Sequence, residues 1–154
     1  MAQRFIMLVG IAGSGKSTWA QHPIINEEEI EAAVVSSDAI REELYGDASI
    51  QTNPAAVFGV MNARTLTLLQ EGQSVIYDAT NLRAKNRKEM LEKVRAIIPD
   101  CEAICIFFEI HITECQERQS LRDRKVPFEV IKRQARQFEL PQYWEGWDKI
   151  LRVP

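Results

Sequence analysis

A glycine-rich segment directly after an apolar run is the feature of this sequence that most constrains its fold. Residues Gly10–Ser17 read GIAGSGKS, and the run Phe5–Val9 before them is entirely apolar. The segment matches the pattern G-x-x-x-x-G-K-[ST], which forms a phosphate-binding loop (P-loop) between a strand and a helix. Because a strand before it and a helix after it are both expected, we prefer this interpretation to a glycine-rich turn with a chance Lys-Ser pair.

Each residue type in this loop has a chemical reason. Glycines allow successive backbone N–H groups to converge on an anion, and the helix that begins near Gly15 directs the positive end of its dipole at the same point. Lys16 is expected to reach the β- and γ-phosphates of ATP, and the Ser17 hydroxyl is expected to ligate Mg²⁺. The predicted nucleotide contacts of this segment are Gly10, Ala12, Gly13, Ser14, Gly15, Lys16, Ser17 and Thr18.

The size and composition of the chain indicate one domain, to which we assign residues 1–154. The sequence has no uninterrupted run of about 20 apolar residues, so no association with a membrane is expected. Cys101, Cys105 and Cys115 are odd in number and lack C-x-x-C spacing, which favours buried thiols in a reducing compartment. We therefore expect a soluble, cytoplasmic protein.

The charge pattern limits the partners of the chain. A formal net charge of −3 argues against a broad surface for duplex nucleic acid, but a strand end remains possible as a substrate. Positive charge is concentrated between Arg118 and Arg136, whereas Glu27–Glu31 is expected to be a solvated face.

Apolar runs alternate with helical patterns, which predicts an α/β fold with a parallel sheet covered on both faces. Five strands are expected, at Arg4–Val9, Ala33–Ser36, Ser74–Tyr77, Ala103–Glu109 and Lys149–Val153. Helices are expected between the P-loop and Pro23, at Ala39–Tyr45, at Pro54–Glu71, at Ala84–Ile98, after a capping box of Thr113 and Gln116, and between Pro127 and Pro141. The last two form a predicted lid, approximately residues 113–140.

Asp38 follows the second predicted strand, and ligands of open α/β sheets bind beyond the carboxyl ends of the strands. In this position Asp38 can accept the proton of an acceptor hydroxyl, and Arg41 can hold the acceptor. An equal alternative is that Asp38 caps the helix that follows, with Arg41 exposed.

Asp78 ends the third predicted strand, where an aspartate can support Mg²⁺, orient the acceptor or cap the turn at Thr80–Asn81. We prefer a role in the site. Arg83 and Arg87 follow four residues apart on one helix face, where contact with an acceptor and simple solvation explain them equally well.

Arg118 and Arg122 also share a helix face, at the start of the basic segment. Arginines of a mobile segment can neutralise the charge of a phosphoryl-transfer transition state, so contact with the nucleotide is favoured over a basic surface helix. His22 and His111 lack metal-ligand companions and receive no role. Core packing is the expectation for three aromatic residues near the C-terminus, Phe138, Trp144 and Trp147.

Four segments occur in the same order as in a known family, namely Gly10–Trp19, Ser37–Arg41, Asp78–Leu82 and Glu117–Pro127. Together they resemble the kinase domain of the phage and bacterial polynucleotide 5′-hydroxyl kinases, over nearly the whole chain. The resemblance implies a P-loop NTPase fold, in which a five-stranded parallel sheet of order 2-3-1-4-5 has helices on both faces and a helical lid.

The resemblance also implies roles on the donor side. Lys16 and Ser17 match the P-loop lysine and serine of the family, and Arg118 and Arg122 match its lid arginines. Asp78 matches its strand-end aspartate. The cofactors expected are therefore ATP and Mg²⁺, with Ser17 and Asp78 as the metal ligands.

On the acceptor side, Asp38 matches the general base of the family and Arg41 its acceptor-phosphate arginine. The predicted catalytic residues are Lys16, Asp38 and Arg122. The predicted acceptor contacts are Asp38, Arg41, Asp78, Asn81, Arg83 and Arg87.

The expected activity is transfer of the γ-phosphoryl group of ATP to the 5′-hydroxyl of a DNA or RNA strand. The low net charge leaves a second possibility, a kinase for a nucleoside, sugar, antibiotic or nucleotide-sugar. Its acceptor pocket would lie between Asp38, Arg41 and the helix at Pro54–Glu71. A nucleotide-binding switch without acceptor chemistry is a third possibility, and an aspartate beside a basic lid argues against it.

Overall fold

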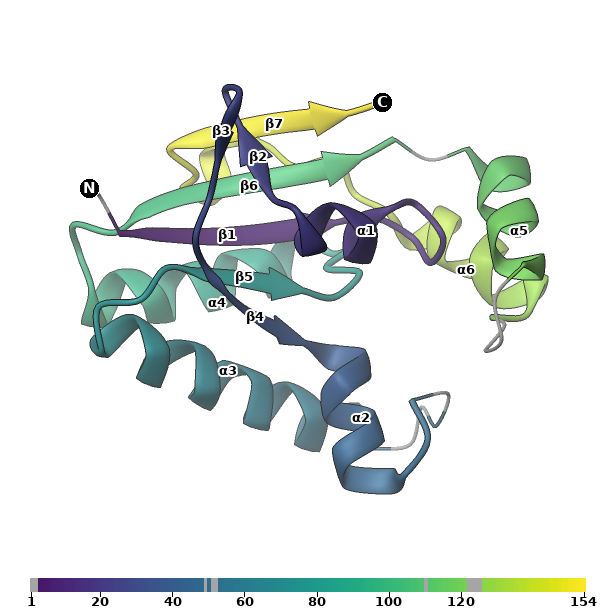
Figure 1. The fold of residues 1–154 in the computed structure, drawn as a ribbon, viewed down its shortest axis with the longest axis horizontal. Coiled ribbons are helices and arrows are strands. Elements are labelled where there is room, and N and C mark those ends of the chain that lie inside the picture. Colours follow the sequence, from purple (N-terminus) through teal and green to yellow (C-terminus); the bar gives the residue numbers. More distant parts are fainter. Residues whose placement is uncertain (1–2, 49, 51–52, 110, 122–125) are drawn as a thin grey trace.

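A five-stranded parallel sheet forms the centre of the computed structural model, which describes residues 3–48, 50, 53–109, 111–121 and 126–154. The strands are β1 (Arg4–Val9), β4 (Ala33–Ser36), β5 (Val75–Asp78), β6 (Glu102–Phe108) and β7 (Lys149–Val153). They lie in the order β4-β5-β1-β6-β7, and every neighbouring pair is parallel (Figure 1). Counted along the chain, this is the order 2-3-1-4-5 that the resemblance implies.

After Arg4, the central strand β1 is entirely apolar because its side chains alternate between two cores. Phe5, Met7 and Val9 belong to one buried cluster, whereas Ile6 and Leu8 belong to the cluster on the opposite face. A strand of this kind needs cover on both sides, and the rest of the chain supplies it.

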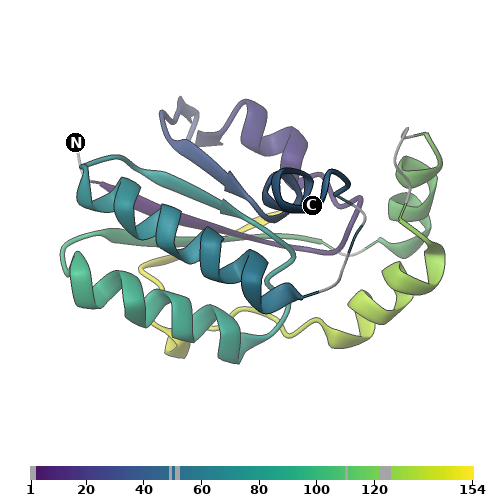
Figure 2. The same cartoon turned by 90° about the horizontal axis from the view of Figure 1, so that it is seen from below.

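Two long helices cover one face of the sheet, and a short helix with a hairpin covers the other. Helices α3 (Pro54–Gln70) and α4 (Ala84–Ile97) lie side by side on the first face (Figure 2). The second face is covered by α1 (Lys16–Gln21) and by the antiparallel pair β2 (Ile24–Ile25) and β3 (Glu28–Glu29). No helix of the described residues is long and apolar enough to cross a bilayer.

The hairpin was not expected from the sequence, which predicted only a solvated acidic face there. The two glutamates of β3 are exposed, as predicted, but the segment is folded. Asn26 and Glu27 both have positive φ angles, 53° and 65°, as the tight turn of a two-residue hairpin requires. Ile25 of β2 is buried and anchors the hairpin to the second hydrophobic cluster.

The carboxyl ends of the strands are flanked by α2 (Ser37–Tyr45), α5 (Ile112–Ser120) and α6 (Phe128–Gln137). The single turn η1 (Tyr143–Glu145) instead packs beside α4 and precedes β7. A third buried cluster, of Ile11, Leu82, Cys115 and Ile131, packs α5 and α6 against the P-loop. The predicted capping box of Thr113 is wrong, because α5 already begins at Ile112 and has no side-chain cap.

The C-terminal aromatic residues divide between core and surface. Trp147 is 4% exposed and stacks on Phe5, with ring centroids 6.3 Å apart, as predicted. Phe138 is partly buried against the core. The expectation for Trp144 is wrong, since its side chain is 66% exposed on η1. The three cysteines are free and buried, in agreement with the sequence analysis.

Candidate active site

A cavity of about 300 Å³ lies where β1, β4 and β5 end. Residues of the P-loop, the start of α2 and the end of β5 line it, together with residues of α3, α5 and α6. Because parallel strands end at one edge of the sheet, side chains from distant parts of the sequence meet there. This is the place that the sequence predicted for the site.

The P-loop has the backbone conformation that its glycines allow. Gly13 and Gly15 have φ angles of 81° and 102°. A Cβ atom on Gly13 would lie 2.7 Å from the carbonyl oxygen of Cys115, so α5 leaves no room for a side chain there. The loop is tied to α6 as well, since the Ala12 N–H donates to Gln134 Oε1 at 2.9 Å.

Lys16 folds back across the loop at the start of α1. Its side chain is buried, and its Nζ donates to the Ile11 carbonyl at 3.0 Å. Lys16 also lines the cavity, so its ammonium group lies at the phosphate-binding end of the site.

Ser17 and Asp78 form a polar pair at the base of the cavity. The Ser17 hydroxyl donates to Asp78 Oδ2 at 3.3 Å, and both residues line the cavity. Burial raises the pKa of the Asp78 carboxyl, the Lys16 charge and the Ser17 hydrogen bond act in the opposite direction, and the charge of Asp38 raises it further.

This pair fits a magnesium site of the kind found in kinases. Mg²⁺ prefers oxygen ligands and is commonly held by one or two protein oxygens together with phosphates and water. The part of the chain that the structure describes has no group of three or more His, Cys, Asp or Glu residues that would form an all-protein metal site. A hydroxyl and a carboxylate beside the P-loop suit a metal that arrives with a nucleotide.

Asp38 and Arg41 lie together on the first turn of α2. The helix begins at Ser37, and its cap is Ser36, whose Oγ accepts from the Ala39 N–H at 3.3 Å. The alternative that Asp38 caps this helix is therefore wrong. Asp38 Oδ1 instead lies 3.3 Å from Arg41 Nη1, and both residues line the cavity.

Buried polar atoms without partners concentrate at this site. Among the described residues, three buried side-chain atoms make no hydrogen bond: Ser14 Oγ, Arg41 Nε and Gln119 Nε2. Arg41 and Gln119 line the cavity, and Ser14 belongs to the P-loop. Because an unpaired buried polar group costs free energy, such atoms are rare in folded proteins and need a reason. A polar ligand in the cavity is a sufficient reason.

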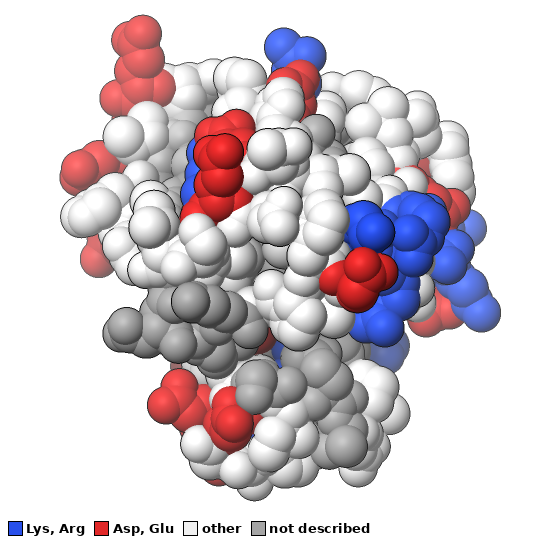
Figure 3. Space-filling model, turned by 90° about the vertical axis from the view of Figure 1, so that its right-hand side faces the viewer, with Lys and Arg blue, Asp and Glu red and all other residues white. Residues whose placement is uncertain are grey.

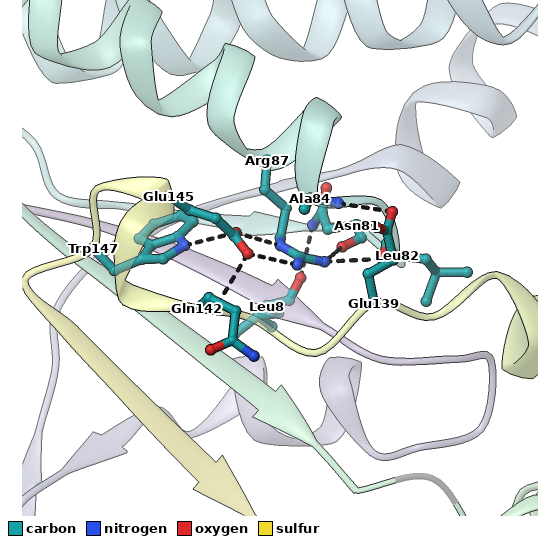
Figure 4. A network of polar contacts seen from close by, with 9 residues as sticks. All are labelled: Leu8, Asn81, Leu82, Ala84, Arg87, Glu139, Gln142, Glu145 and Trp147. Atoms are coloured by element: carbon teal, nitrogen blue, oxygen red, sulfur yellow. Dashed lines mark hydrogen bonds and ion pairs between the residues drawn. The ribbon is translucent and has the colours of Figure 1, made fainter.

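Arg87 has a different role from the predicted one. Its side chain is fully buried, and it donates from Nε and Nη2 to the two carboxylate oxygens of Glu145 at 2.8 and 2.9 Å (Figure 4). Its Nη1 donates to the carbonyls of Asn81 and Leu82, each at 2.9 Å. Arg87 therefore holds the segment after β5 from behind, and the prediction that it contacts the acceptor is wrong.

Asn81 and Arg83 also lie outside the cavity lining. The Asn81 side-chain amide donates to the Leu8 carbonyl at 2.7 Å, which ties the segment after β5 to β1. Arg83 is exposed and lies 3.9 Å from Glu139. Both act as parts of the frame in this structure, and their predicted contacts with the acceptor are not supported by its geometry.

The lid arginines are placed only in part. Arg118 Nη1 donates to the Gly13 carbonyl at 3.1 Å, and its Nη2 donates to Glu114 at 2.6 Å, so this guanidinium lies against the P-loop. Arg122 lies outside the described residues. Of the predicted P-loop contacts, Gly10, Ser14 and Thr18 do not line the cavity. Gly10 is needed for packing, because a Cβ atom there would lie 2.6 Å from Ser14 Oγ.

Several residues of the cavity were not predicted from the sequence. They are Phe58 on α3, Gln119 on α5, Val126 and Pro127 before α6, and Val130, Arg133 and Gln134 on α6. Arg133 carried a signal as part of the basic segment, and Gln119, Val126 and Pro127 lie within the segment Glu117–Pro127 of the resemblance, but none of them was assigned a contact. The others, Phe58, Val130 and Gln134, have no local motif, since their proximity to the P-loop depends on how α3 and α6 pack.

Positive charge gathers beside the cavity on α6. Figure 3 views the molecule from the side where α5 and α6 lie in Figure 1, and it shows Lys and Arg side chains clustered on the right of this face. Lys132 pairs with Glu129 at 3.2 Å and lies over the Phe128 ring. Arg133 lines the cavity, whereas Arg136, one turn further on, does not.

Comparisons with known proteins agree with this geometry. A family model described as an AAA domain matches residues 5–141. The chain is similar to the L-seryl-tRNA(Sec) kinase of Methanococcus maripaludis, with 26% identity over 93% of this chain and 55% of the relative. The chain thus spans about half the length of that curated relative.

Solved structures share the fold. A chain of the Pnkp1/Rnl/Hen1 RNA repair complex superposes with a TM-score of 0.67 at 23% identity, over 88% of this chain and 44% of that one. The Mycobacterium tuberculosis APS kinase CysC, in complex with AMPPNP and APS, superposes with a TM-score of 0.62 at 19% identity, over 98% and 88% of the two chains.

Proposed function

The chain belongs to this AAA-domain family, and we propose that it is an ATP-dependent kinase that phosphorylates the 5′-hydroxyl of a polynucleotide strand. One observation carries the proposal. Lys16 and the P-loop face the same cavity as the Asp38–Arg41 pair, so groups suited to a phosphate donor and to a hydroxyl acceptor share one space. A nucleotide switch would need only the first set.

The proposed reaction assigns one task to each group. The Asp38 carboxylate accepts the proton of the acceptor hydroxyl. At the same time the hydroxyl oxygen attacks the γ-phosphorus of ATP, and the bond from this phosphorus to the departing ADP oxygen breaks. Lys16 and the P-loop amides stabilise the negative charge on the phosphoryl oxygens. Arg41 orients Asp38 and the acceptor. Ser17 and Asp78 would hold Mg²⁺, which would supply further positive charge to the phosphates.

Three findings support a polynucleotide acceptor. The curated relative is, by name, a kinase of a charged tRNA, and one structural neighbour is part of an RNA repair complex. Arg41 and Arg133 approach the cavity from α2 and α6, and arginines suit the phosphates that flank a strand-end hydroxyl.

A small-molecule acceptor is the second candidate. A volume of about 300 Å³ is at the lower end of the range for small-molecule sites, and Phe58 and Val130 give part of the wall an apolar character. The fold of the APS kinase CysC, which was solved with its small acceptor, is also similar.

Transfer of label from γ-³²P-ATP separates the two candidates. The acceptors are 5′-hydroxyl RNA and DNA oligonucleotides, seryl-tRNA, and a panel of nucleosides, sugars and APS, each with the wild-type protein and with Asp38→Asn. The proposal predicts labelled 5′ ends with the wild type and a loss with the variant. Label on small molecules alone would favour the second candidate, and no labelled product would reject a kinase.

A further inference from the structure

We propose that Gln119 is a further substrate-contacting residue, whose side-chain amide donates a hydrogen bond to the γ-phosphoryl group of ATP. The inference rests on the proposed function in one respect, namely that ATP occupies the cavity. It concerns an uncharged residue of α5 that lies between the two lid arginines and for which the sequence predicted no contact.

The orientation of the Gln119 amide is fixed by its neighbour. Its Oε1 accepts from the Val126 N–H at 3.1 Å. A flipped amide would place two donors against each other, so Nε2 must be the atom on the other side. That atom is buried and has no hydrogen-bond partner among the described residues. The side chain is 2% exposed and lines the cavity.

The position of Gln119 on α5 places this donor beside the phosphate-binding loop. Cys115 and Gln119 lie four residues apart and are the two buried residues of the helix, so they share one face. That face packs on Gly13, since a Cβ atom there would lie 2.7 Å from the Cys115 carbonyl oxygen. Gln119 lies four residues, about 6 Å, further along the same face.

The rest of the cavity identifies the phosphate that this donor meets. P-loop amides and the start of the following helix bind the phosphates nearer the nucleoside. The cavity that Gln119 lines also contains Asp38 and Arg41, on the side where the acceptor is proposed to lie. The γ-phosphoryl group must lie between these two sides if transfer is to occur. A neutral donor there binds ATP in preference to ADP.

Two substitutions of the same kind on the same helix provide the test. Gln119→Glu keeps an oxygen for the Val126 N–H but replaces the donor with a carboxylate oxygen. Gln116→Glu adds the same charge at an exposed position one turn away that does not line the cavity. Affinities for AMPPNP and for ADP are measured by calorimetry with Mg²⁺ at pH 8, where an ordinary glutamate is ionised.

We expect Gln119→Glu to weaken AMPPNP binding at least about tenfold and to leave ADP binding within about twofold of the wild type. Gln116→Glu should change neither affinity. Gln119→Met, which has a similar length and no donor, should show the same preference for ADP to a smaller degree. Binding of ADP also verifies that each variant is folded.

Two results would overturn the inference. Equal weakening of AMPPNP and ADP would show that Gln119 only supports the loop, and unchanged binding of both would show that its amide does not meet the γ-phosphoryl group. The test needs no acceptor. A wild-type protein that binds AMPPNP but phosphorylates nothing would therefore reject the proposed kinase activity without deciding the role of Gln119.

Discussion

The two sides of the segment Ala79–Leu82 differ in how their buried polar groups are satisfied. Behind the segment, Arg87 makes two hydrogen bonds to Glu145 and two to backbone carbonyls. In front of it, the cavity contains Arg41 Nε and Gln119 Nε2, which have no partner in the described protein. Polar groups that serve the fold are paired within the fold. The groups in front are therefore the ones that await a ligand, and both regions can be tested by substitution.

The largest effect is expected in front, from Asp38→Asn. Loss of a general base should lower kcat by about 10²–10⁴-fold, while the affinity for AMPPNP and the melting temperature stay near those of the wild type. The measurement is the initial rate of label transfer at saturating ATP. Glu42→Gln, an exposed position on the same helix, is the control. Full activity of Asp38→Asn would remove the aspartate from the mechanism.

A large effect of a different kind is expected behind the segment, from Arg87→Met. This change leaves the Glu145 carboxylate buried without its cation, which should lower the free energy of unfolding by about 3–5 kcal/mol. Urea denaturation measures the loss, and Arg87→Met combined with Glu145→Gln should recover part of it. Lys88→Met, which removes an exposed pair with Glu92 from the same helix, should cost less than about 1 kcal/mol. Similar losses in the free energy of unfolding for Arg87→Met and Lys88→Met would show that the buried pair stabilises the fold no more than an exposed one.

A smaller effect is expected from Arg133→Ala, which removes a cation from the cavity wall. We expect KM for a polynucleotide acceptor to rise about tenfold with little change in KM for ATP, since one charged hydrogen bond to the acceptor is lost. Arg136→Ala removes an equal charge outside the cavity and should have little effect. If both variants raise KM equally, the charge of α6 acts at long range and Arg133 does not touch the acceptor.

The smallest effect concerns the response to pH. The pKa of the carboxyl group in front of the segment, Asp78, is raised, whereas that of the carboxyl group behind it, Glu145, is lowered. Burial raises the pKa of Asp78 above its usual 3.8. Burial also acts to raise the pKa of Glu145, but hydrogen bonds from Arg87 and Trp147 outweigh it, and the net pKa lies below the usual 4.5. Stability from Glu145 is thus present above 4.5 and is lost only as the pH falls through its lower folded value.

The raised pKa of Asp78 moves its protonation to higher pH than in a free aspartate, and the lowered pKa of Glu145 moves its protonation to lower pH than in a free glutamate. As the pH is lowered, we therefore expect kcat/KM to decline before the fold is lost. Parallel titrations of label transfer and of near-ultraviolet circular dichroism compare the two. If the two transitions coincide, activity is lost at low pH because the protein unfolds, and protonation of Asp78 has no separate effect.

Local patterns predicted the donor side of the site from the sequence. The spacing of Gly10, Gly15 and Lys16 is the sequence motif of a phosphate-binding loop, and the apolar runs predicted the buried strands. The placement of Asp38 and Asp78 near the site followed because parallel strands end at one edge, whereas the role of Asp38 as the base was implied by the family resemblance. These inferences needed no knowledge of long-range packing.

The rest depended on contacts between distant residues. Arg87 was misplaced because its partner Glu145 lies 58 residues away, and helix periodicity alone cannot show that a charged side chain is buried. Gln134 was missed because its bond to Ala12 spans 122 residues. Gln119 has the ordinary appearance of a surface glutamine until α5 is packed against Gly13.

The central claim is that the buried polar groups without protein partners are ligand contacts. It is tested most directly by a crystal structure of the protein with AMPPNP, Mg²⁺ and the unphosphorylated acceptor. We predict that Gln119 Nε2 lies within about 3.2 Å of a γ-phosphoryl oxygen, and that Arg41 Nε lies within about 3.2 Å of the acceptor or of a water molecule bound to the acceptor. A nucleotide bound in the cavity with both atoms still unpaired would contradict it.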